Sequence, residues 1–315
     1  MGISLRLEKI QVGTIKNRIW NTIRIMDAKD LLLDSLETRG TAYREKLKDC
    51  RAEPSEKAVH DLRTSIRRLL ATLAVVAFVT SDARVDKLSD RLDKQLDALS
   101  ELRDLHVMLE KVSEDAKTAP ELEPFQVYLE KREQRKQQAV EKDIKEIKPN
   151  SVEKPLLQIQ GELEDLSPAV LENKLPQAVD EAYLTVMQRY GEVEPSQLTS
   201  IHHLRVAFKN FRYMVEAIHP CLPDFPEAQL ERMHDYQTQM GNIHDLQVLL
   251  KTLAKFAEDS DLYDSRPTRR SYEKALAEAV ATFLHHKEEV MKFWRPTPLS
   301  AFPWQGKPKK KEEHL

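Results

Sequence analysis

The sequence predicts an all-α protein made of two four-helix bundles that are related by internal duplication and pseudo-twofold symmetry. Long segments carry apolar residues at positions i, i+3, i+4 and i+7, as Leu62, Ile66, Leu69 and Leu73 do, which is the period of a helix that buries one face. Only 7 glycines and 6% aromatic residues argue against a fold rich in strands and tight turns. Two motifs also recur at nearly the same offset, which predicts the duplication.

Prolines separate the predicted helices, because a proline interrupts the helix interior. In the first half, residues 1–150 with an N-terminal extension, we expect helices at 14–49, 56–80, 83–115 and 121–147. In the second half, residues 175–296, we expect helices at 175–192, 196–219, 225–258 and 268–294. A polar, proline-bearing connection at 151–174 joins the halves and can hold a short helix, and residues 297–315 are expected to form a disordered basic tail.

Two sequence motifs indicate the duplication. The first, His60-x-Leu-Arg63-x3-Arg67, recurs 142 residues later as His202-x-Leu-Arg205-x3-Lys209. The second, Leu-Arg-Asp-Leu at residues 102–105, recurs 141 residues later as Ile-His-Asp-Leu at residues 243–246. The nearly equal offsets predict two related bundles, in which symmetry brings the copies of each motif together.

Composition limits the classes of function. The 315 residues carry a formal net charge of −3, which argues against general DNA coating, since such proteins are strongly basic. The longest apolar run, residues 69–79, is too short to span a bilayer. Two distant cysteines, Cys50 and Cys221, have no metal or redox spacing and favour a reducing compartment. We therefore expect a soluble, cytoplasmic protein without a membrane partner.

Three helices carry stripes of basic residues. At about 100° per residue, His60, Arg63 and Arg67 fall within an arc of roughly 60° beside the apolar face of their helix. The second stripe spans roughly 80° and comprises His202, Arg205, Lys209 and Arg212. The third stripe comprises Arg84, Lys87, Arg91 and Lys94. Arg68 lies roughly 80° from His60, on the side away from Arg63 and Arg67.

The stripes contain no acidic residue, although the chain has 52. A solvated helix face is the simpler interpretation of any one stripe, but such faces usually mix the two signs of charge. Like charges at i and i+4 repel, so an unmixed stripe destabilises its helix unless an anion or a buried carboxylate compensates it. A groove or pore lined by Arg, Lys and His would suit phosphate oxygens, which accept paired hydrogen bonds from guanidinium groups.

Asp104 and Asp245 occupy equivalent positions in apolar helices, where an unpaired carboxylate is costly. We interpret them as structural partners that orient basic residues of the neighbouring stripe by an ion pair or a cap. The alternative is a metal-dependent phosphohydrolase that uses His244 and Asp245 with His202 or His234. No zinc spacing, Gly-rich phosphate loop or nucleophile triad is found, so no cofactor and no catalytic residue is predicted.

Four stretches resemble the CHAD family, the conserved-histidine α-helical domain. They are VHDLRTSIRRLL at 59–70, LRDLHVML at 102–109, IHHLRVAFKNFRYMVE at 201–216 and IHDLQVLL at 243–250. The resemblance covers roughly residues 20–295. It implies two four-helix bundles around a central basic groove or pore, binding of inorganic polyphosphate and association with polyphosphate granules. It also adds Arg68 and Tyr213 to the expected binding residues, although position 210 is Asn where the first half has Arg68.

We therefore expect non-catalytic binding of inorganic polyphosphate by the basic stripes, with histidines that donate more strongly when protonated near pH 6. Specific DNA binding is not expected. Besides the phosphohydrolase, the remaining alternative is a helical scaffold whose stripes dock an acidic protein partner.

Overall fold

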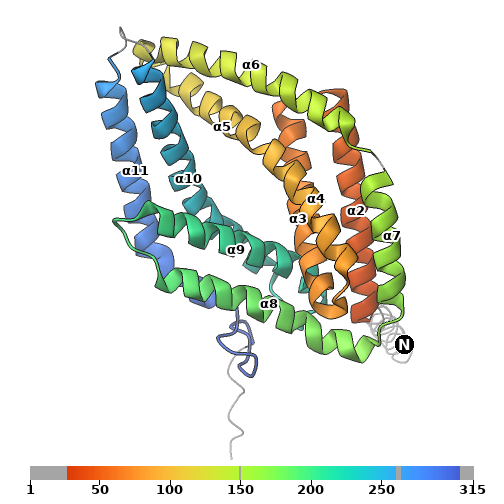
Figure 1. Ribbon diagram of the computed structural model, residues 1–315. Helices are drawn as coiled ribbons and strands as arrows, with labels where there is room; N and C mark the ends of the chain where they lie inside the picture. The colour runs from red at the N-terminus through yellow and green to blue at the C-terminus, as the bar shows by residue number, and fades with distance from the viewer. Residues whose placement is uncertain (1–26, 149, 260–263, 306–315) are drawn as a thin grey trace, which may run out of the picture.

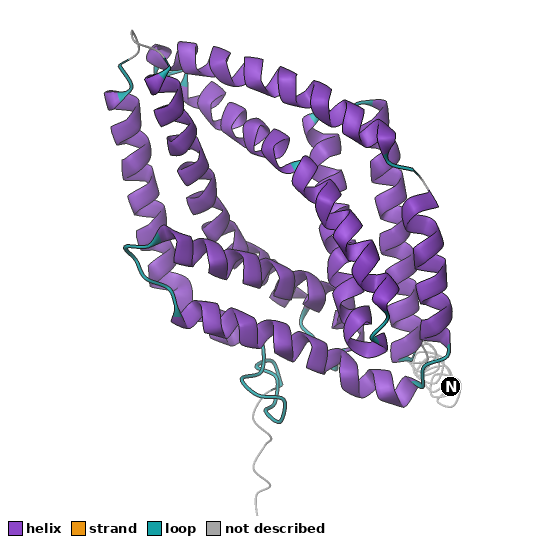
Figure 2. Ribbon diagram, viewed as in Figure 1, coloured by secondary structure: helices purple, strands orange, loops and turns teal. Residues whose placement is uncertain are grey.

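The computed structural model describes residues 27–148, 150–259 and 264–305, and every regular element in these ranges is a helix (Figures 1 and 2). The all-α prediction is therefore confirmed. The first part of the chain forms α2 (Ala28–Ala52), α3 (Glu56–Thr80), α4 (Ala83–Ala98), α5 (Ser100–Asp115), α6 (Glu123–Glu146) and α7 (Asn150–Glu164). The second part forms α8 (Pro168–Gly191), α9 (Leu198–Ile218), α10 (Glu227–Glu258) and α11 (Arg266–His286). Short 3-10 turns follow at Pro120–Leu122, His219–Cys221 and Lys287–Lys292.

The helices close into a four-sided frame (Figure 1). One side is formed by α2, α3, α4 and α7, and the adjoining side by α8 and α9. The helices α10 and α11 form the side opposite the first, and α5 and α6 complete the frame. Each half of the sequence therefore supplies two neighbouring sides.

The apolar core does not divide at the boundary between the halves. One large cluster runs from α2, α3 and α7 through α8 and α9 to Trp294, and includes Leu62, Phe208 and Phe211. A smaller cluster lies where α5 and α6 meet α10 and α11, and is centred on Phe125. The two predicted bundles are therefore not separate apolar units, since α3 of one packs directly on α9 of the other.

The bounds of α3 match the prediction residue for residue. Ser55 is its N-cap, and the Ser55 hydroxyl accepts a hydrogen bond from the Ala58 amide at 3.3 Å. The helix ends at Ser81, whose left-handed conformation (φ 55°) closes the last turn. Leu62, Ile66 and Leu69 on the inner face are fully buried.

The single helix expected at 83–115 is wrong, because the chain breaks at Leu99 between α4 and α5. Ser100 Oγ donates to the Leu96 carbonyl at 2.9 Å, and Arg63 Nη1 donates to the same carbonyl at 3.0 Å. Side chains that bind a helix carbonyl draw it away from its own ladder and bend the helix. The counterpart, α10, runs without interruption over 32 residues.

The connection expected at 151–174 is mostly helical. It holds nearly all of the 15-residue α7 and the first turns of α8, which starts at Pro168 and contains Pro176. Pro at the first helical position needs no amide partner, so it favours an early start of α8. The helix α7 packs closely on α2 at Gly40, where an added Cβ would lie 2.9 Å from Leu156 Cδ1.

The two ends of the chain differ from the prediction where the structure describes them. Residues 14–26 of the first predicted helix lie outside the described residues, and α2 starts at Ala28 behind an Asp27 cap. The disordered tail predicted from residue 297 is wrong for 297–305, where Phe302 is buried and stacks on Trp304 with ring centroids 4.6 Å apart. Residues 306–315 lie outside the described residues.

Candidate functional site

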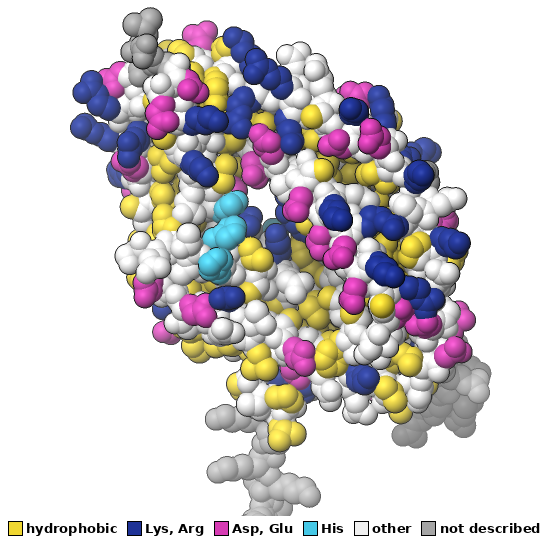
Figure 3. All heavy atoms as spheres, viewed as in Figure 1, with side chains coloured by type: hydrophobic (Ala, Val, Ile, Leu, Met, Phe, Trp, Pro, Cys, Tyr) yellow, Lys and Arg dark blue, Asp and Glu magenta, His cyan; other side chains and the backbone are white. Residues whose placement is uncertain are grey.

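The four sides of the frame enclose a cavity of about 410 Å³, to which α3, α5, α9 and α10 all contribute. Five Arg and Lys side chains and two Asp side chains line it, with three histidines. The ionisable lining residues are His60, Arg63, Arg67, Arg103, Asp104, His202, Arg205, Lys209, His244 and Asp245. Figure 3 shows histidines beside a hollow at the centre of this face, with Lys and Arg side chains inside it.

Both copies of each duplicated motif lie at this cavity. The first stripe contributes His60, Arg63 and Arg67 from α3, and its counterpart contributes three residues from α9. Both stripes border the apolar face of their helix, and the direct packing of α3 on α9 therefore brings them together. The carboxylates of Asp104 and Asp245 face the same space from α5 and α10.

Three arginines in the cavity have an unused donor. The Nε atoms of Arg63, Arg67 and Arg205 are buried and have no hydrogen-bond acceptor among the described residues. Arg63 is 6% exposed, and its Nη1 is held by the Leu96 carbonyl and by Ser100 Oγ at 2.8 Å. Burial, together with the Arg67 charge, lowers the pKa of Arg63 to about 10, so its guanidinium is still charged at neutral pH. A buried donor without an acceptor is costly, so these three groups are available to an acceptor that enters the cavity.

Lys209 lies among these guanidinium groups. Burial, together with the charges of Arg67 and Arg205, lowers its pKa to about 7. No hydrogen bond or ion pair within the described ranges compensates its charge. A bound anion would reverse this effect, because a nearby negative charge favours the protonated amine.

The histidines differ from the expectation of protonation near pH 6. Burial lowers the pKa of His60, His202 and His244, and nearby arginines lower it further; for His244 the value is about 4. The rings of His202 and His244 lie 5.1 Å apart between centroids. At neutral pH these imidazoles are therefore neutral donors rather than cations.

The direct ion pairs expected for Asp104 and Asp245 do not form within the described residues. Burial raises the pKa of both carboxyls above the ordinary value. The charge of Arg63 opposes this shift at Asp104, and the charge of Arg205 opposes it at Asp245. Their role is therefore a longer-range one: they offset the repulsion among the cavity cations without occupying a guanidinium hydrogen bond.

Arg212 and Tyr213 lie behind the cavity wall. Arg212 is 8% exposed, its guanidinium lies 4.3 Å from the centroid of the Tyr213 ring, and its Nε donates to Gln237 Oε1 at 2.9 Å. Gln237, in contrast, lines the cavity. The structure therefore makes Arg212 a residue that positions Gln237, and Tyr213 a core residue.

Arg68 faces away from the cavity, as its position on the helix predicts. It forms an ion pair with Glu216 of α9 at 2.9 Å. It also lines a smaller hollow of about 210 Å³ between α2 and α3, which shares His60 with the cavity. His60 therefore stands between two basic spaces.

The third stripe is not brought to the cavity. Arg84 pairs with Asp82 at 3.0 Å and with Glu162. Arg91 donates to the Ser151 carbonyl of α7, and it lines with Lys94 a hollow between α4 and α6 that also contains Asp143 and Glu146. Lys87 is exposed. Arg91 and Lys94 are exposed as well, and none of the four residues lines the cavity.

The model of the CHAD domain matches residues 36–254, which is more than half of the chain. The chain belongs to the CHAD domain family. No curated protein sequence matches it.

Two solved structures share the CHAD fold of this chain at low sequence identity. The crystal structure of the CHAD domain from the plant Ricinus communis is 16% identical, with a TM-score of 0.58 over 83% of this chain and 87% of that chain. PptA from Streptomyces chartreusis is 15% identical, with a TM-score of 0.58 over 84% of this chain and 96% of that chain.

The CHAD cavity contains residues that sequence reasoning missed. Arg103 lines it and pairs with Glu56 at 2.7 Å, and Ser100, Gln237 and Asn242 add polar groups. Arg103 precedes Asp104 in the duplicated motif, a signal that could have identified it. The other three side chains carry no charge, and only the helix crossings bring them to the site.

Two absences concern the metal-dependent alternative, and a third concerns the membrane. No group of three or more His, Cys, Asp or Glu side chains that could hold a metal ion occurs in the described part of the chain. His234 does not line the cavity. None of the helices described combines the length and apolarity needed to cross a lipid bilayer.

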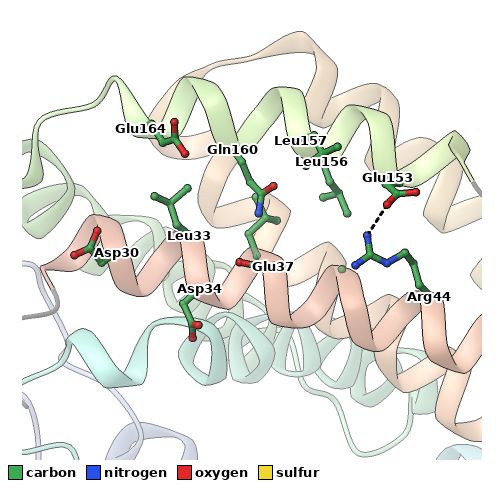
Figure 4. A pocket seen from close by; sticks show the side chains of 12 residues that line it. Asp30, Leu33, Asp34, Glu37, Arg44, Glu153, Leu156, Leu157, Gln160 and Glu164 are labelled. Carbon is green, nitrogen blue, oxygen red and sulfur yellow. Dashed lines mark hydrogen bonds and ion pairs between the residues drawn. The ribbon is translucent and has the colours of Figure 1, made fainter.

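A hollow of similar size between α2 and α7 is acidic (Figure 4). Its carboxylates come from Asp30, Asp34, Glu37, Glu153 and Glu164, and its one lining cation, Arg44, pairs with Glu153 at 3.1 Å. Such a surface repels anions. The central cavity therefore differs from the acidic hollow in the sign of its charge, although the acidic hollow is comparable in volume at about 430 Å³.

Proposed function

We propose that this CHAD domain binds inorganic polyphosphate in the central cavity, without catalysis. One observation carries the proposal. Arg63, Arg67 and Arg205 come from two packed helices and line the same cavity. Their Nε donors are buried and have no acceptor among the described residues. A phosphate polymer supplies several acceptor oxygens in a row, and guanidinium groups bind them in pairs.

The charge balance supports a polyanion as the ligand. The chain as a whole is slightly acidic, yet five cations gather against two carboxylates in the cavity. Binding a linear polyanion to several cations releases counterions, so affinity should fall steeply with salt. With about four cations engaged, the logarithm of the association constant should fall with the logarithm of salt concentration with a slope of about −3.

The chemistry of the lining supports binding rather than turnover. Arginines do not exchange protons at neutral pH, so they act as fixed charges rather than as acids or bases. The metal-dependent alternative would use His244 and Asp245, but no group of three or more side chains that could hold a metal ion occurs among the described residues. We infer that a polyphosphate chain leaves the cavity intact, which a measurement of released phosphate tests directly.

The decisive experiment removes the cavity cations together. The variant Arg63→Gln, Arg67→Gln, Arg205→Gln, Lys209→Gln should lose polyphosphate affinity by more than about 100-fold, because each charged hydrogen bond contributes about 1.5–3 kcal/mol. Titration at two salt concentrations, with DNA and ATP as competitors, measures the loss and its specificity. Circular dichroism should show unchanged helicity.

The matched control removes four cations outside the cavity. The third-stripe variant Arg84→Gln, Lys87→Gln, Arg91→Gln, Lys94→Gln changes the net charge equally but leaves the cavity lining untouched. It should bind polyphosphate with nearly wild-type affinity. Equal loss in both variants would contradict the site, since net charge alone would then explain binding.

The same samples separate the alternative functions. Phosphate release with bound metal would support the phosphohydrolase, and binding of an acidic protein that polyphosphate cannot displace would support the scaffold. In cells, the proposal places the protein in the cytoplasm at polyphosphate granules. A fluorescent fusion that colocalises with granules, and no longer does so with the cavity variant, would support it.

A further inference from the structure

The hollow between α2 and α3 carries its own group of cations. Arg39 and Lys46 line it from α2 and Arg68 from α3, against one lining carboxylate, Asp61. The helices α2 and α3 pack along each other, and the hollow lies between their polar edges. The remaining lining residues are small or hydroxylated: Thr38, Ala42, Thr64 and Ser65.

The cations of this hollow are only partly neutralised. No hydrogen bond or ion pair joins Arg39 to the described residues, although the Glu216 charge acts on it electrostatically. The Nε of Arg68 is buried without an acceptor. Glu216 binds Arg68 through Oε1 at 2.9 Å, while its buried Oε2 meets no donor. Lys46 contacts Asp49 and Asp61 at the longer distances of 3.5 and 3.4 Å. Ion pairs as exposed as those of Lys46 contribute little to stability, so an anion can compete for the lysine.

The hollow is continuous with the cavity at His60, which lines both. From His60 to Arg68 the hollow follows α3 for about 12 Å at 1.5 Å per residue. Another hollow adjoins the cavity on the α5–α10 side, and the two share the lining residues Val107, Asn242 and Asp245. This hollow is acidic, because Glu110, Glu114 and Asp115 line it with a single lysine. A phosphate chain that extends beyond the cavity is therefore attracted across His60 and repelled from the α5–α10 side.

We propose that the hollow lined by Arg39, Lys46 and Arg68 is a second phosphate subsite, which binds the continuing part of a polyphosphate chain already held in the cavity. The inference rests on the proposed function and adds a direction to it: the chain passes His60 and runs along α3. Glu216 competes with the chain for Arg68. Long polymers then gain contacts that short ones cannot reach.

The test compares two chain lengths. In Arg39→Gln, Lys46→Gln, affinity for long-chain polyphosphate should fall about tenfold or more, which corresponds to about 1.4 kcal/mol. The salt slope should become less negative by about 1 to 2. Affinity for tripolyphosphate, which fits in the cavity, should stay within about twofold because its contacts remain. The control Lys131→Gln, Arg135→Gln removes two exposed cations of α6 and should change neither affinity.

A second variant gives an effect of opposite sign, which misfolding cannot mimic. Glu216→Gln keeps the shape but removes the competing charge, so affinity for the long polymer should rise several-fold while tripolyphosphate affinity stays the same. Unchanged long-chain affinity in both variants, or an equal loss for both ligands, would overturn the subsite and leave the cavity assignment intact. If the wild-type protein binds neither ligand, the proposed function itself fails.

Discussion

Lys209 shows how a single residue can link the cavity to pH. Its pKa of about 7 lies below the ordinary value of 10.5, because burial and four neighbouring arginines disfavour the charged amine. The folded protein therefore binds fewer protons than the unfolded chain between these values. The contribution of Lys209 to the free energy of unfolding rises as pH increases from about 7 to about 10, and it is lost as pH falls through this window.

Anion binding should show the reverse dependence. If polyphosphate binds in the cavity as we propose, it binds more tightly when Lys209 is protonated, so affinity should fall by up to about tenfold per pH unit as pH rises from about 7.5 to about 9. A long polymer is the appropriate ligand, because its few terminal phosphates contribute little to titration. Isothermal titration calorimetry in buffers of different ionisation enthalpy would also show proton uptake.

Two variants isolate Lys209 from other titrating groups. Lys209→Met removes the titration and should give weaker, pH-independent binding over this range, whereas Lys209→Arg keeps the charge and should hold affinity at about pH 9. A wild-type affinity that does not change between pH 7.5 and 9 would contradict the role of Lys209.

At the scale of single elements, α3 and the α4–α5 pair show what local sequence specifies. The bounds of α3 follow from its Ser55 cap and its apolar period, both of which are local signals. Beside the break at Leu99, the Leu96 carbonyl accepts a hydrogen bond from Arg63, which lies 33 residues before Leu96 in sequence. Apolar residues keep the helical spacing throughout residues 83–115, so the sequence pattern alone does not locate the break.

The Ser55 cap provides a test of the start of α3, the turn that carries His60. Ser55→Ala removes the acceptor for the Ala58 amide and should lower the free energy of unfolding by about 1 kcal/mol. Ser55→Asp should retain stability, because Asp caps helices as well as Ser does. Denaturant unfolding measures both. Equal stability of all three proteins would show that the cap does not stabilise α3.

At the scale of the whole molecule, the repeated motifs predicted correctly which basic residues lie together. They predicted the packing of the helices less well. His60, Arg63 and Arg67 and their sequence counterparts line one cavity, which agrees with the expectation drawn from the repeated motif. The third stripe does not join them: Lys87, Arg91 and Lys94 are exposed, and Arg91 donates to the Ser151 carbonyl of α7. Where a helix packs depends on the whole set of apolar faces, and a repeat motif does not contain that information.

The described C-terminal segment also belongs to the core. Arg295 donates to both carboxylate oxygens of Asp180 in α8, at 2.8 and 2.6 Å, and Trp294 Nε1 donates to Asp180 Oδ1 at 2.8 Å. Asp180 is 5% exposed. These contacts anchor residues beyond the matched 36–254 range to the helix that packs beside α9. The basic composition of the tail gave no sign of this anchor, since its partner lies more than 100 residues away.

Breaking this buried pair should destabilise the whole protein. Asp180→Asn leaves the Arg295 charge buried without a counter-ion, and Arg295→Met leaves the carboxylate without its bidentate partner; each should lower the free energy of unfolding by about 3 kcal/mol. The double variant should lose about 2 kcal/mol less than the sum of the single losses, because the two residues act as a unit.

The control Glu181→Gln, an exposed carboxylate on the same helix, should change stability by less than about 0.5 kcal/mol. Chemical denaturation of the four variants gives the coupling energy. Strictly additive losses, or single losses as small as that of the control, would mean that the C-terminal segment is not anchored through Asp180.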